Sequence, residues 1–74
     1  MSSKFESKYD WRDGSESPRD NRDVAFNMFL DSTNRLGIFR NGVFVEPGSS
    51  GKVWGPRSIA HWVYLEPDGT MTRK

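Results

Sequence analysis

His61 is the only histidine in the chain, and it is the first residue to consider for chemistry. An imidazole can act as a general base or bind zinc, but a zinc site needs further ligands at a suitable spacing. The chain has no cysteine, and no H-x-x-x-H or H-x-x-E pattern includes His61. Because the neighbouring residues are Ala60 and Trp62, we predict a strand-face or core-rim histidine with no catalytic or metal-binding role.

A glycine-rich segment, PGSSGKV, has part of the pattern of a phosphate-binding loop. That motif requires a glycine five residues before its Gly-Lys pair and a serine or threonine after the lysine. This chain has Glu46 at the first position and Val53 at the second, and the Glu46 carboxylate would repel phosphate. We interpret the segment as an ordinary loop.

Two pairs of carboxylates, Asp10 with Asp13 and Glu66 with Asp68, could in principle supply a general acid and a general base. A general acid needs a raised pKa, which burial provides, and both pairs stand in turn-like or charged surroundings. The serine-nucleophile pattern G-x-S-x-G is also missing from the sequence. We therefore predict a non-enzyme without a cofactor or a metal.

The segment GKVWGPRS combines basic and aromatic residues, namely Lys52, Trp54 and Arg57. A tryptophan between cations can stack on a base, and Trp and Arg are also enriched at the energetic centres of protein interfaces. Trp54 could equally belong to the core. Only two or three phosphate contacts are available here, which is few for a nucleic-acid binder. Together with Arg40 on the neighbouring hairpin, these three residues are the candidate partner-binding site.

The stretch from Asn21 to Leu36 has helical spacing. Ala25, Phe29 and Leu36 fall near one line at 100° per residue, and other apolar residues widen that face. Asp20 or Asn21 can cap the start, and Gly37 can end the helix in the left-handed conformation. We predict a helix over 21–36 with Phe29 near the centre of its contact with a sheet. The predicted core contains Phe26, Phe29, Phe39 or Phe44, and Trp62.

Strands are predicted after this segment. Asn41-Gly42 stands between Ile38–Arg40 and Val43–Val45, and this pair is a strong hairpin signal because both turn residues accept positive φ. Lys52–Trp54 and the apolar segment within 58–65 favour strands, although a single helical turn at 58–61 is an alternative. Glu66–Gly69 forms a turn, after which 70–72 pairs back.

The first 19 residues carry many charges of both signs and little that could form a core. Ordering a residue costs about 1–2 kcal/mol, so we predict a flexible charged arm at 1–19 and a single small domain at 20–74. The arm contains three aromatic residues that could dock on the domain or become ordered on a partner, namely Phe5, Tyr9 and Trp11. The predicted fold class is α+β, with one helix packed on a small antiparallel sheet of three to five short strands and a disordered N-terminal arm.

The chain is 74 residues long, has no cysteine and starts with MSSKFESKYDWRD. Its predicted organisation is a single domain with a charged arm and a helix followed by strands. In these features it resembles the small RNA polymerase-binding transcription regulators of lytic phages, such as that of a Xanthomonas phage. The resemblance implies binding to the β′ subunit of bacterial RNA polymerase, inhibition of initiation through interference with σ factor, and a role in antitermination.

The expected function is therefore that of a regulator that binds bacterial RNA polymerase. We expect a monomer that makes no specific contact with DNA and none with a membrane, in the cytoplasm, which is the host cytoplasm if a phage encodes the chain. No window of the sequence approaches the 18 apolar residues of a membrane span. The alternative function is a small nucleic-acid-binding module that uses the basic aromatic loop.

Overall fold

A computed structural model describes residues 8–48 and 51–74, except for the side chain of Ser32. Among these residues the only helical element is the short 3₁₀ turn η2 (Pro56–Ser58). The rest is built on six strands: β1 (Arg12–Asp13), β2 (Arg22–Met28), β3 (Asp31–Arg40), β4 (Val43–Glu46), β5 (Lys52–Trp54) and β6 (Ile59–Tyr64).

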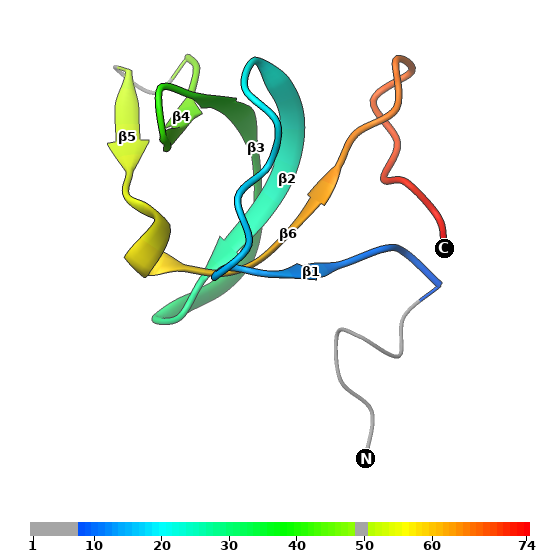
Figure 1. Ribbon diagram of the computed structural model, residues 1–74, viewed down its shortest axis with the longest axis horizontal. Helices are drawn as coiled ribbons and strands as arrows, with labels where there is room; N and C mark the ends of the chain where they lie inside the picture. The colour runs from blue at the N-terminus through cyan, green and yellow to red at the C-terminus, as the bar shows by residue number, and fades with distance from the viewer. Residues whose placement is uncertain (1–7, 49–50) are drawn as a thin grey trace.

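The six strands form one antiparallel sheet in the order β1-β6-β2-β3-β4-β5. Strands β2 to β5 follow one another as a meander. The chain then passes through η2 and returns, so that β6 pairs with β2 at the start of the meander. The sheet is strongly curved, and β2 and β3 bend along their length (Figure 1).

The predicted fold class is wrong, because the segment 21–36 forms no helix. It forms β2, a turn at Phe29-Leu30, and most of β3, with Met28 paired to Asp31 across the turn. β2 lies between β3 and β6 and is buried on both faces, and a doubly buried strand has a continuous apolar run instead of an alternating one. Such a run also fits a helical period, which explains the misreading.

The residues expected to begin and end that helix have other roles. The Asp20 carboxylate accepts a hydrogen bond of 2.9 Å from the backbone N–H of Asn41, and Asn21 has a φ of 64°. Gly37 lies within β3, where a Cβ atom would collide with the carbonyl oxygen of Val45 and press on the ring of Phe26. The first two residues thus fix the β3–β4 hairpin, and Gly37 allows close packing of neighbouring strands.

The predicted strands after residue 37 are confirmed. Asn41 and Gly42 have φ values of 54° and 81° and form the turn of the β3–β4 hairpin. Strands also form at Lys52–Trp54 and Ile59–Tyr64, and the expected pairing of 70–72 is confirmed by a bridge between Leu65 and Met71. The helical turn considered at 58–61 is replaced by η2, which ends where β6 begins.

The sheet carries one apolar cluster on each face. On the face that we call inner, the buried residues are Val24, Phe26, Phe39, Phe44, Ile59 and Trp62. On the outer face, Trp11, Ala25 and Val63 are buried, with Tyr9, Leu65 and Met71 packed against them. Phe26, Phe39, Phe44 and Trp62 therefore confirm the predicted core, whereas Phe29 is 70% exposed and does not belong to it.

Residues 8–19 lie against the sheet, so the expectation of a disordered arm is corrected for them. β1 pairs with β6, and Trp11 is only 6% exposed on the outer face. The indole N–H of Trp62 donates to the carbonyl oxygen of Glu16 at 2.9 Å. Residues 1–7 of the expected arm lie outside the described residues. Whether residues 20–74 fold alone, as the boundary at 19 implies, stays a prediction.

Candidate functional site

The structure brings together two of the four predicted partner-binding residues. Trp54 at the end of β5 and Arg57 in η2 line one surface hollow. Lys52 is exposed at the other end of the short strand β5. Arg40 lies at the end of β3 and lines a different hollow. The four residues therefore do not form a single site.

The hollow beside Trp54 and Arg57 is formed with the β2–β3 turn. We call this region the turn surface; it is lined by Met28, Phe29, Leu30, Asp31, Trp54, Arg57 and Ser58. Leu30 is 100% exposed, and the backbone N–H of Phe29 donates to the carbonyl oxygen of Ser58 at 3.3 Å. This bond ties the turn, which carries Phe29 and Leu30, to η2, which carries Arg57.

Phe29 and Leu30 were not expected to form a binding surface, because the spacing of apolar residues predicted a helix over both positions. One signal was available, namely that two large apolar residues precede the polar run Asp31 to Asn34. Those polar residues favour turns over helices because their side chains bond to nearby backbone groups. Here the Asp31 carboxylate accepts a hydrogen bond of 3.0 Å from the N–H of Thr33.

Trp54 is half-buried and held by neighbours. Its ring packs against the inner cluster, and the guanidinium of Arg35 lies 5.5 Å from its ring centroid. The indole N–H donates to the Glu46 carboxylate at 3.4 Å, and Arg35 also pairs with Glu46 at 3.2 Å. Trp54 therefore serves partly as a core residue, one of the three roles that its sequence context left open.

Arg35 also pairs with Asp31 at 2.8 Å, directly next to the exposed turn. Hydrogen bonds from Thr33, and then the bond from Arg35, lower the pKa of Asp31 to about 2. Charge-assisted bonds of this kind stabilise the ionised carboxylate. The Asp31 carboxylate at the turn surface is thus already paired within the chain, with an arginine that it shares with Glu46.

We expect this carboxylate to make folding sensitive to acid. Its folded-state pKa is below the unfolded value, so its contribution is complete above a pH of about 4 and is lost as the pH falls toward about 2. Asp31→Asn should weaken that part of the acid dependence. Carboxyl-carbon NMR titration of Asp31 would measure the midpoint directly, and a midpoint near 4 would contradict the described bonds.

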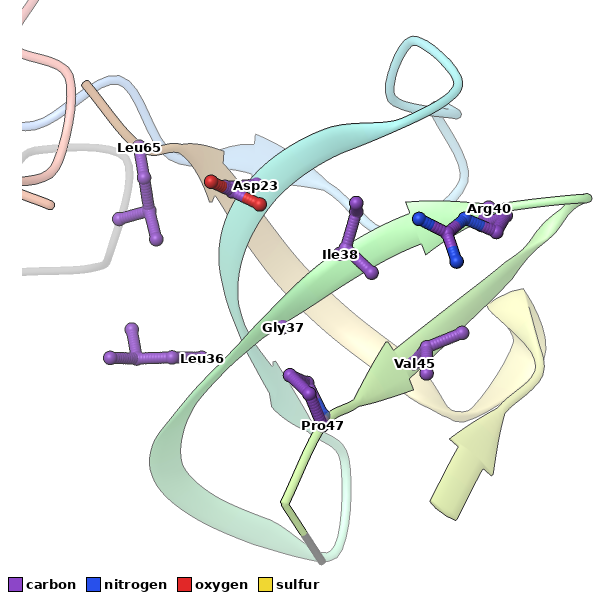
Figure 2. Close-up of a pocket in the computed structure, with 8 residues that line it drawn as sticks. All are labelled: Asp23, Leu36, Gly37, Ile38, Arg40, Val45, Pro47 and Leu65. Atoms are coloured by element: carbon purple, nitrogen blue, oxygen red, sulfur yellow. The ribbon is translucent and has the colours of Figure 1, made fainter. Parts of the chain in front are cut away.

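A second hollow lies on the outer face, where β2, β3 and β4 run side by side (Figure 2). We call it the outer groove; its lining residues are Asp23, Leu36, Gly37, Ile38, Arg40, Val45, Pro47 and Leu65. Strand register explains it, because Asp23, Ile38 and Val45 are opposite one another and share the outer face. Leu36 is 61% exposed there. The groove depends on the pairing of β2, β3 and β4, for which the sequence contains no local signal over 21–36.

The three predicted basic residues keep their charges available. Among residues 8–48 and 51–74, Arg40, Lys52 and Arg57 form no ion pair with a carboxylate. Arg40 donates from Nε to the side-chain oxygen of Asn21 at 3.1 Å, which fixes its position beside the outer groove. Each of these cations can therefore meet an anionic group on a partner.

His61 lies half-buried on β6, opposite Asp13 of β1, as a strand-face residue. Within the described part of the chain, no group of three or more His, Cys, Asp or Glu side chains is arranged to hold a metal ion. In the same part of the chain, no helix is long and apolar enough to cross a membrane.

Comparison with known proteins found no protein-family model, no curated protein and no solved structure that matches this chain.

Proposed function

We propose that this protein is a non-catalytic regulator that binds a larger protein through the turn surface, and that the partner is bacterial RNA polymerase. The observation that carries the proposal is the exposed pair Phe29-Leu30 beside Trp54 and the cation of Arg57. Aromatic residues and arginine are the types that dominate the binding energy of protein interfaces. Because both side chains are exposed, they contribute little to the core, and the turn does not require large apolar residues. Binding of a partner would explain why they are there.

The charge of the turn surface favours a partner with an apolar pocket next to a carboxylate. Asp31 is paired with Arg35, whereas Arg57 has no carboxylate partner among the described residues. The cation beside Phe29 and Leu30 that has no carboxylate partner in the described part of the chain is therefore Arg57. An acidic rim on the partner would complement it and would speed association.

The alternative function, binding of nucleic acid through Lys52, Trp54 and Arg57, has less support. Base stacking needs a free aromatic face. The Trp54 ring packs against the inner cluster, and the guanidinium of Arg35 lies near its centroid. Only Lys52 and Arg57 would then remain to contact phosphates, and this number gives a weak electrostatic contribution.

The identity of the partner comes from the resemblance to the phage regulators, and so does the proposed action. By that resemblance, the protein binds the β′ subunit, interferes with σ factor engagement during initiation and acts in antitermination. The turn surface is small, so it suits a regulator that acts by occupying a site that another protein needs. This mode of action fits a chain of 74 residues.

The test is binding to purified, nuclease-treated bacterial RNA polymerase, followed by promoter-dependent transcription in vitro. The double variant Phe29→Ser, Leu30→Ser should bind roughly tenfold or more weakly, because residues at the centre of an interface each contribute more than about 1 kcal/mol. Arg57→Glu should also weaken binding and reduce its salt dependence. These are exposed positions, so thermal unfolding should change little.

Val53→Ser is the matched control, because it removes an apolar side chain that is 57% exposed, from a strand whose residue 53 belongs to the outer face. It should bind as the parent does. If the parent fails to bind polymerase at micromolar concentration, the proposed partner is wrong. If the parent binds and the double variant binds equally well, the partner stands and the turn surface is wrong.

A further inference from the structure

The outer groove places apolar side chains at a surface where an antiparallel sheet usually has polar ones. Ile38 and Val45 are opposite each other in the strand register and are only half-buried. Leu36 lies two residues before Ile38 on β3, so it belongs to the same face, and it is 61% exposed. Contiguous exposed apolar residues of this kind are typical of a contact surface.

One acidic and one basic residue stand beside Ile38 in this groove. Asp23 is opposite Ile38 on β2, and Arg40 lies two residues beyond Ile38 on β3 (Figure 2). Both are exposed, and neither forms an ion pair with any residue of 8–48 or 51–74. Arg40 donates from Nε to Asn21 at 3.1 Å, so its terminal guanidinium nitrogens can bind a carboxylate. The groove thus presents two opposite charges that the described chain does not pair.

This arrangement is complementary to itself. In a two-fold symmetric interface the same patch of both copies meets, and every contact between two different residues occurs twice. An axis that lies in the plane of the interface and passes between Asp23 and Arg40 places each Asp23 opposite Arg40 of the second copy. The same rotation brings the two Ile38 side chains together near the axis. A nucleic acid would fit less well, because the Asp23 carboxylate would repel its phosphates.

We propose that the outer groove is a two-fold contact with a second copy of this chain. Leu36, Ile38 and Val45 pack across the contact, and Asp23 pairs with Arg40 of the second copy on both sides of the axis. The apolar residues supply most of the affinity, because exposed ion pairs contribute little, whereas the charges fix the orientation. So small a contact gives a weak and transient dimer. The inference is independent of the proposed function, because the outer groove and the turn surface have no residue in common.

Sedimentation equilibrium of the full-length chain, from about 10 µM to about 1 mM, covers the range in which weak complexes dissociate. We expect the average mass to rise from 8.5 kDa toward twice that value. Asp23→Arg and Arg40→Asp should each weaken self-association roughly tenfold or more, because each places like charges opposite one another twice. Leu36→Ser should weaken it as well, through loss of apolar contact. All three positions are exposed, so amide spectra should retain the dispersion of the parent.

The decisive measurement is a titration of isotope-labelled Asp23→Arg with unlabelled Arg40→Asp, followed by the amide signals of β3 and β4. In the mixed dimer the two substitutions again place an acid opposite a base on both sides, so association should be about as strong as in the parent. Lys52→Asp is the matched control for the unlabelled chain. It lowers the net charge by the same amount at a strand position on the inner face. Its association with labelled Asp23→Arg should be at least about tenfold weaker.

Four results would overturn the proposal. The parent could remain at 8.5 kDa up to the highest concentration. Its self-association could persist unchanged in Asp23→Arg and Arg40→Asp, which would place the contact elsewhere. The complementary pair of variants could fail to associate, or labelled Asp23→Arg could bind Arg40→Asp and Lys52→Asp equally, which would indicate attraction by net charge alone. Polymerase binding is measured at micromolar concentration, where the chain is mostly monomeric, so the two proposals can fail separately.

Discussion

Phe26→Ala is expected to unfold this protein, whereas Phe29→Ala, only three residues away, is expected to leave it folded. Phe26 is 0% exposed in the inner cluster, with its ring centroid 5.3 Å from that of Phe44. Truncation of a buried phenylalanine costs about 3–5 kcal/mol. A core of this size supplies about that much stability in total, so little would remain.

Phe29→Ala is the matched control, because the same side chain is removed from an exposed turn. Its effect on the free energy of unfolding should stay within about 0.5 kcal/mol. The two variants distinguish the strand from the predicted helix, in which Phe29 would occupy the centre of the buried face. Urea denaturation and amide spectra would measure both. Loss of structure in Phe29→Ala with retention in Phe26→Ala would contradict the described fold.

The sequence predicted the second half of the chain well because local signals specify it. Asn41-Gly42 adopts positive φ at both positions, which few residue pairs accept, so the hairpin could be recognised without tertiary information. The turn at 66–69 is equally local, with a hydrogen bond of 2.8 Å from the N–H of Gly69 to the carbonyl oxygen of Glu66.

The first half could not be predicted in the same way, because β2 depends on both of its neighbours. Val24 and Phe26 are buried in the inner cluster and Ala25 in the outer one, and both clusters contain side chains of β6, which comes almost forty residues later. A periodicity argument treats such a run as one face of a helix. The polar run from Asp31 was the local contrary signal, and it marks the start of β3.

The candidate site, like the fold, could be predicted only in part. Trp54 and Arg57 could be selected from the residue types of one loop, and they do line a common hollow. The β2–β3 turn completes that hollow with Phe29 and Leu30, which became surface residues only through the strand pairing. Arg40 was grouped with the loop because its hairpin is near in sequence, although it lies beside the outer groove.

Disorder was predicted for residues 8–19 on energetic grounds, and this expectation was wrong. Ordering cost was compared with the apolar content of the segment alone, which is small. Trp11, however, is buried against Ala25 and Val63, so the segment helps to cover these two residues of the sheet. Burial is thus shared between the segment and the sheet, and it cannot be assigned to either part by itself.

Deletion of residues 1–19 is accordingly expected to prevent folding of the remaining chain. It removes Trp11, whose burial is worth about 3–5 kcal/mol, and it removes β1 from the edge of β6. It also removes two hydrogen bonds of 2.9 Å, from Trp62 to Glu16 and from the N–H of Arg19 to the hydroxyl of Tyr64. The loss equals or exceeds the stability expected of so small a domain.

Deletion of residues 1–7 is the control, because it removes none of these contacts and should preserve the cooperative unfolding transition. Circular dichroism and amide spectra of the two truncated chains would decide between the alternatives. A dispersed spectrum for residues 20–74 would establish an independent domain with an accessory arm, as the sequence first indicated. A poorly dispersed spectrum would show that Trp11 and β1 are integral to the sheet, because Trp11 packs on Ala25 of β2 and Val63 of β6.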